Sequence, residues 1–119
     1  MKRHLLQIAF AVLAGLSAAS AQKAAAPSAG DAEKGRQLYL KIGCWECHGR
    51  QAQGGGYTGP RLAPDPTPIE GLIWYVRQPT GDMPPYTAKV VSDQELGDIY
   101  AFLRSVPRPP AAKTIPILK

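Results

Sequence analysis

The sequence predicts a small all-α domain in which about three main helices are joined by long Gly/Pro-rich loops. Three segments place apolar residues at the i, i+3, i+4, i+7 spacing of one helical face, and capping residues mark their ends. The stretches between them are rich in glycine and proline, which each occur 12 times in the 119 residues. Neither a strand-like alternation of useful length nor an internal repeat is present.

Residues 1–21 have the pattern of a secretory signal peptide. Lys2 and Arg3 give a positive start, residues 5–16 form a mostly apolar core of 12 residues, and residues 19–21 (Ala-Ser-Ala) provide a small-residue cleavage site. An apolar core of this length is too short to span a bilayer stably, so no stable membrane anchor is expected. We therefore expect a periplasmic or secreted protein.

Removal of that segment would leave one small folded domain, which we expect at residues 31–106. Residues 22–30, rich in Ala, Pro, Ser and Gly, are expected to form a flexible leader, and residues 107–119 an extended or disordered Pro-rich tail. The formal charge is +5, but the basic residues are scattered along the chain. This distribution indicates a solvated surface and no nucleic-acid partner.

The first helix is expected to begin after Asp31, a favourable N-cap residue, and to end at Gly43. Its buried face is predicted from the helical spacing of four residues: Gly35, Leu38, Tyr39 and Ile42. A glycine inside a helix lowers stability by about 1 kcal/mol relative to alanine. We therefore expect another element to approach closely at Gly35.

The last helix has the clearest boundaries. Ser92 and Glu95 form a capping box, and Val91 can pack against Leu96 across it. Pro107 ends the helical run. The apolar stripe consists of Leu96, Ile99, Tyr100, Leu103 and Val106, with Phe102 beside it.

A further helix is expected between Thr67 and Gln78. Thr67 and Glu70 have the spacing of a capping box, and Pro68 would occupy the first helical position, which proline favours. Pro79 ends the helix, because the residue before a proline disfavours helical backbone angles.

Two long loops separate these helices. Residues 49–66 contain five glycines and three prolines, so the backbone must turn repeatedly and no regular element is expected. Residues 79–90 form a second such loop, in which Met83 is followed by two prolines. Loops of this kind are expected to wrap around a group that the helices do not supply.

The most informative feature of the chain is the pentapeptide at residues 44–48 (Cys-Trp-Glu-Cys-His). Two cysteines separated by two residues and followed directly by histidine are the covalent attachment signature of a c-type haem. In one helix-like turn, two thiols can reach the two vinyl groups of one porphyrin, while the imidazole binds its iron. The sequence therefore predicts one covalently bound haem c, with Cys44 and Cys47 as thioether attachments and His48 as an axial iron ligand.

Two other kinds of site share part of this pattern. A redox-active dithiol has the same two-residue spacing but normally follows a β-strand, and no strand pattern precedes Cys44. A zinc site would need further ligands, yet the chain holds only two cysteines, and its other histidine, His4, lies in the expected signal segment. Haem attachment is the interpretation that the sequence favours.

From Asp31 to Val106, the sequence resembles the class I c-type cytochromes, which are small all-α electron carriers with one haem. The matching features occur in the family's order: the helix with Gly35 and Tyr39, the motif at 44–48, the turn at 58–60 (Thr-Gly-Pro), Met83-Pro84, and the terminal helix with Phe102-Leu103. The resemblance implies that the helices and loops enclose the haem.

The resemblance also implies two contacts. The first helix would cross the last at Gly35, packing against Phe102. The backbone carbonyl of Pro60 would accept a hydrogen bond from the ring nitrogen of His48 that faces away from the iron, which fixes the tautomer and the orientation of the ring.

The second axial ligand decides whether the iron is open to substrates. Met83 is the candidate, because the only other methionine, Met1, lies in the expected signal segment. A thioether is a soft, neutral ligand that favours ferrous iron and raises the reduction potential. A lone methionine more often fills a gap in a core, but the Pro-rich loop around Met83 favours the ligand role.

Three further residues are candidates for the haem pocket: Trp74, Arg77 and Tyr86. Their polar groups, and the guanidinium of Arg61, could hydrogen-bond to or pair with the haem propionates. Ordinary packing of the aromatic rings and solvent exposure of the arginines are the alternatives for each.

These expectations describe a periplasmic, monohaem one-electron carrier between larger redox proteins, which is not itself an enzyme. With His48 and Met83 on the iron, no position is open for a substrate.

One alternative is a haem subunit of a periplasmic dehydrogenase or oxidase complex. A less favoured one is a five-coordinate haem that binds a gas or peroxide. The expected partners are an electron donor and an electron acceptor, and the chain would be a monomer or a subunit of a complex.

Overall fold

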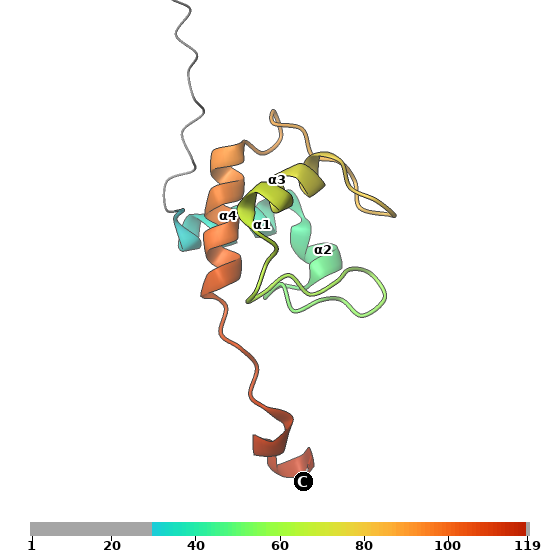
Figure 1. Ribbon diagram of the computed structural model, residues 1–119, viewed down its shortest axis with the longest axis vertical. Coiled ribbons are helices and arrows are strands. Elements are labelled where there is room, and N and C mark those ends of the chain that lie inside the picture. Colours follow the sequence, from blue (N-terminus) through green and yellow to red (C-terminus); the bar gives the residue numbers. More distant parts are fainter. Residues whose placement is uncertain (1–29, 119) are drawn as a thin grey trace, which may run out of the picture.

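The computed structural model describes residues 30–118 (Figure 1). The expected signal segment and all but the last residue of the expected leader lie outside this range. The described part of the chain is helical and contains no strand, which confirms the all-α prediction. Its elements are the α-helices α1 (Ala32–Ile42), α2 (Cys44–His48), α3 (Ile69–Arg77) and α4 (Asp93–Ser105), followed by the 3₁₀ helices η1 (Ala112–Thr114) and η2 (Pro116–Leu118). Among these helices, none is both long enough and apolar enough to cross a membrane.

Both ends of α1 are set by the residues that the sequence indicated. The carboxylate of Asp31 accepts hydrogen bonds from the backbone N–H groups of Glu33 and Lys34, at 2.9 and 3.0 Å. These bonds satisfy two of the amides that a helix start leaves without partners. At the other end, Gly43 has φ 91°, a left-handed conformation that favours glycine.

The centre of the fold is the crossing of α1 and α4 (Figure 1). Gly35 lies at this crossing, and a Cβ atom there would overlap the backbone carbonyl of Asp98. The close approach expected at Gly35 is therefore confirmed. The resemblance placed Phe102 against this glycine; the structure places backbone atoms of Asp98 and Ile99 nearest to it, and the ring of Phe102 packs on Tyr39 with centroids 5.3 Å apart.

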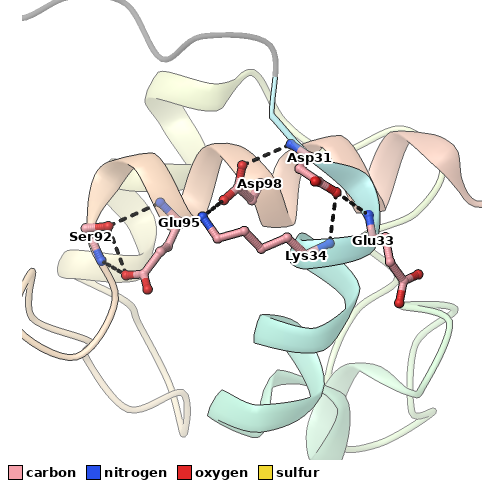
Figure 2. A network of polar contacts seen from close by, with 6 residues as sticks. All are labelled: Asp31, Glu33, Lys34, Ser92, Glu95 and Asp98. Carbon is pink, nitrogen blue, oxygen red and sulfur yellow. Dashed lines mark hydrogen bonds and ion pairs between the residues drawn. The ribbon is translucent and has the colours of Figure 1, made fainter.

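The start of α4 carries the predicted capping box (Figure 2). The hydroxyl of Ser92 accepts from the amide of Glu95 at 3.2 Å, and the carboxylate of Glu95 accepts from the amide of Ser92 at 2.8 Å. Val91 and Leu96 on either side are both buried. The buried core as a whole consists of Tyr39, Ala52, Ala63, Leu72, Val91, Leu96, Ile99, Phe102 and Leu103.

The start of α3 differs from the prediction. No side chain caps this helix, and Pro68 is its N-cap residue rather than its first helical residue. The backbone of Pro68 is extended, with φ −48° and ψ 148°, so the helix begins one residue later than expected and a capping box from Thr67 does not form. The other end is as predicted, because the helix stops at Arg77 with Gln78 as its cap.

The C-terminal tail is more ordered than its composition suggested. It was expected to be extended or disordered, but it ends in η1 and η2 and leads away from the helices (Figure 1). The turn of η1 forms because the hydroxyl and the amide of Thr114 both donate to the carbonyl of Ala111, at 2.7 and 2.8 Å. Where the tail leaves the domain, Arg108 pairs with Asp65 at 2.7 Å, but both side chains are exposed, so this pair contributes little stability.

A buried carboxylate links α1 to α4 (Figure 2). The side chain of Asp98 accepts from the backbone amide of Asp31 at 2.9 Å and lies 2.6 Å from the ammonium of Lys34. Asp98 is only 3% exposed, and the hydrogen bond from Lys34 is the main cause that holds its pKa below the ordinary value. The ionised form of Asp98 is therefore the form that the fold stabilises.

Replacing Asp98 by alanine should lower the free energy of unfolding by about 1 to 3 kcal/mol at neutral pH, because the partly buried amide of Asp31 loses its acceptor. Urea unfolding of the haem-loaded protein measures this difference. Since the folded pKa lies below the unfolded one, the part of the contribution that depends on the ionised carboxylate is complete above about pH 5, shrinks below about pH 4, and is lost as the pH falls through the folded pKa. A difference that stays constant down to about pH 3 would contradict this account.

Candidate functional site

The residues of the attachment motif form α2, a single helical turn held between two glycines. Gly43 before it has φ 91° and Gly49 after it has φ 81°, both in the region that side chains disfavour. Within the turn, Cys44 and Cys47 are three residues apart, so their side chains lie on the same face. Cys44 is half-buried and Cys47 is exposed, which places the motif at the boundary between core and solvent.

The thiol of Cys44 does not have the properties of a reactive dithiol. Burial raises its pKa to about 11, so it is protonated at neutral pH. Catalytic dithiols instead have a thiolate with a lowered pKa, and none of the described residues forms the preceding strand. Within residues 30–118, no three or more His, Cys, Asp or Glu side chains gather in a group that could hold a metal ion.

His48 is held in the orientation that an iron ligand requires. It is 8% exposed, and its Nδ1 lies 2.8 Å from the backbone carbonyl oxygen of Pro60. A carbonyl can only accept, so Nδ1 carries the proton and Nε2 keeps a free lone pair. The contact with Pro60 that the resemblance implied is present in the structure.

The turn before Pro60 closes over the same side of the motif. The hydroxyl of Thr58 donates to the carbonyl of Cys47 at 2.9 Å. A Cβ on Gly59 would lie 2.9 Å from that carbonyl oxygen and 3.0 Å from Nδ1 of His48, so only glycine lets the turn come this near. Thr58 and Gly59 were part of the matched turn, but neither the hydrogen bond nor the steric limit could be assigned from the sequence.

Two aromatic side chains that were not predicted as site residues, Tyr39 and Trp45, hold α2 in place. The phenol of Tyr39 donates to the carbonyl of Gly49 at 2.8 Å. The indole N–H of Trp45 donates to the carbonyl of Leu40 at 3.1 Å, and the guanidinium of Arg50 lies 4.3 Å from the centre of the Trp45 ring. These three contacts tie the motif to α1 and to the following loop, which keeps the two thiols and the imidazole in register.

Met83 lies in the loop between α3 and α4 and is half-buried. Gly81, two residues before it, has φ 69°, and Pro84 and Pro85 follow it. The two fixed proline φ angles restrict the backbone on the C-terminal side of the methionine, and Gly81 permits the left-handed turn before it. Its ligation to iron stays a prediction.

Tyr86 lies in the loop between α3 and α4, and its backbone is bound to the end of α3. Its ring is half-buried against the core. The pKa of its phenol is raised, first by burial and then by electrostatic interactions with Cys44, Cys47 and Glu46. The role of Tyr86 in the haem pocket stays a prediction.

The other two pocket candidates differ from Tyr86. Trp74 is 59% exposed on α3. The guanidinium of Arg77 hydrogen-bonds to three protein oxygens, those of Tyr86, Val91 and Asp93. Contacts of Trp74, Arg77 and Arg61 with haem propionates stay predictions.

The donor set therefore fits a haem. Two thiols lie on one face of a helical turn, the next residue offers an imidazole lone pair, and a loop after α3 carries a thioether. A haem bound there would supply reversible one-electron chemistry between ferric and ferrous iron, while the protein supplies attachment, orientation and burial.

This all-α fold and this motif define a c-type cytochrome domain. The family model described as "Cytochrome C oxidase, cbb3-type, subunit III" matches residues 30–103, more than half of the chain, and the protein belongs to this family. Its cofactor is therefore a covalently bound haem c with iron, and its chemistry is haem electron transfer. The searches of curated proteins and of solved structures gave no match.

Proposed function

We propose that this protein is an exported, monohaem cytochrome c that passes one electron at a time between larger redox proteins. The observation that carries the proposal is the hydrogen bond from Nδ1 of His48 to the carbonyl of Pro60 at 2.8 Å. It fixes the tautomer in which Nε2 can bind iron, and it raises the basicity of that nitrogen.

The second axial ligand in this proposal is Met83. With His48 and Met83 both bound, the iron has no position for a substrate, so the protein carries electrons and is not itself an enzyme. Cys47 is exposed while Cys44 is half-buried. The haem edge near Cys47 would therefore lie close to solvent, where a partner protein can approach it through a small, transient interface.

Export is supported by the signal-like pattern of residues 1–21. Covalent attachment of haem in an oxidising compartment needs the two thiols to be kept reduced until the haem is added. Fractionation of cells that produce the full chain, followed by haem staining, tests this part of the proposal. Haem-loaded protein confined to the cytoplasm would contradict it.

A redox titration of the purified haem-loaded protein, followed optically, tests the carrier function. One haem per chain should give a single reversible one-electron transition. A protein that cannot be cycled between its ferric and ferrous forms, or one that is reoxidised only with damage to the haem, would contradict the proposal.

A second candidate function is that of a haem subunit in an oxidase or dehydrogenase complex. It is favoured by the family's description, which names an oxidase subunit, and by the folded turns η1 and η2 at the end of the tail. Here the tail of residues 107–119 would dock on the catalytic subunit. Copurification of a large redox subunit with the full chain, lost when the tail is deleted, would support this function over that of a free carrier.

A further inference from the structure

Arg77, the last residue of α3, joins the two ends of the loop that carries Met83. One guanidinium nitrogen, Nη1, donates to the carbonyl of Tyr86 at 2.8 Å. The other, Nη2, donates to the carbonyl of Val91 at 2.9 Å and lies 2.6 Å from the carboxylate of Asp93. One side chain thus contacts three oxygens between the second half of the loop and the first turn of α4.

The backbone of Tyr86 is bound from both sides. Its amide donates to the carbonyl of Val76 at 3.0 Å, and its carbonyl accepts from Arg77. Both partners belong to the last turn of α3. Tyr86 lies three positions after Met83, and both residues between them are prolines with restricted backbone angles. The position of the methionine therefore depends on how firmly Tyr86 is held.

A planar guanidinium suits this arrangement better than an ammonium would. It presents its donors in a fixed fork, so it can satisfy acceptors in different directions without a change of rotamer. The side chain of Arg77 is only 20% exposed, which limits competition from water for these carbonyls. The pair with Asp93 adds less, because the carboxylate is 62% exposed.

We propose that Arg77 is the positioning residue of the second axial ligand: it holds the Met83 loop in the conformation in which the sulfur reaches the iron. This inference rests on the proposed function, in which Met83 is that ligand. It also gives Arg77 a role different from the propionate contact for which the sequence made it a candidate.

The experiment compares Arg77→Met and Arg77→Lys with the matched control Arg36→Met in haem-loaded, full-length protein. Arg36 also makes an ion pair, with Glu33 at 2.8 Å, but on the exposed surface of α1. The main measurement is the apparent affinity of the ferric protein for imidazole, which competes with the methionine for iron. The second is hydrogen exchange at the amide of Tyr86, which reports the loop directly.

If Arg77 holds the loop, imidazole should bind Arg77→Met at least about tenfold more tightly than wild type. In this variant the methionine-bound state is less populated, so Met83 competes less with imidazole for the iron. The charge-transfer band of the methionine-iron bond should weaken, and the Tyr86 amide should exchange faster. The imidazole affinity of Arg77→Lys, which can satisfy fewer acceptors than arginine, should fall between those of wild type and Arg77→Met. If Arg77→Met yields no haem-loaded protein, Arg77→Lys alone tests the inference. Arg36→Met should match wild type.

Two results would overturn the inference. In one, imidazole affinity is unchanged in the Arg77 variants while the reduction potential falls, as expected if Arg77 pairs only with a propionate. In the other, Arg36→Met shows the same increase, which indicates general destabilisation. A wild-type protein that lacks the methionine-iron band would instead refute the proposed ligation, and the inference with it.

Discussion

Replacement of both Cys44 and Cys47 by serine should leave the protein without covalently bound haem. A hydroxyl does not form the thioether that a thiol forms with a porphyrin vinyl group, and His48 alone would be a dissociable ligand. The measurement is haem staining after denaturing electrophoresis, together with extraction into acidified organic solvent. All haem in the double variant should be extractable, whereas wild-type haem should stay with the chain.

Glu46→Gln is the matched control for this change. Glu46 lies in the same helical turn and is exposed, and it is not expected to form a covalent bond with the porphyrin. Its variant should retain covalent haem in full. Stain that persists in the double serine variant would show that the haem is attached elsewhere, and the assignment of the motif would be wrong.

Replacement of Gly35 by alanine should destabilise the fold more than other small substitutions on a helix. The added methyl group would overlap the carbonyl of Asp98, a backbone atom that cannot move without shifting α4. Overpacking of this kind costs about 1 to 3 kcal/mol, and we expect the upper end because the obstacle is backbone. Denaturant unfolding of the haem-loaded variant measures the loss.

The control for this prediction is Gly71→Ala on α3. A Cβ at Gly71 would come no nearer to its neighbours than 3.5 Å, to the hydroxyl of Thr67, which is an ordinary contact. Alanine there should leave stability unchanged or raise it by up to about 1 kcal/mol, from helix propensity. Equal losses at the two glycines would contradict the account of the α1–α4 crossing.

The parts of the fold that follow from local signals were predicted well. Asp31 and Gly43 fix α1, and Ser92 with Glu95 fixes the start of α4, because each signal acts within a few residues. The motif at 44–48 is local in the same sense. The start of α3 was misplaced because a proline with extended backbone angles looks, in sequence, the same as one that opens a helix.

The contacts that complete the site were not predictable from the chain alone. Thr58 reaches the carbonyl of Cys47 from 11 residues away, and Arg77 reaches Asp93 from 16 residues away. Both depend on loops that fold back onto helices, and loop composition does not specify where they meet. Arg77 was a candidate for a propionate contact, with solvent exposure as the alternative. Its protein acceptors are mostly backbone carbonyls, which the identity of a residue does not reveal.

The most direct test of the central claim is an optical spectrum of the purified, haem-loaded protein. It should be recorded oxidised, reduced, and reduced under carbon monoxide, beside a Met83→Ala variant. We predict a six-coordinate, low-spin wild type that is indifferent to carbon monoxide, with a methionine-to-ferric-iron band that disappears in the variant. A high-spin wild type that binds carbon monoxide readily would mean that the iron is open, and would contradict the assignment of this protein as a closed electron carrier.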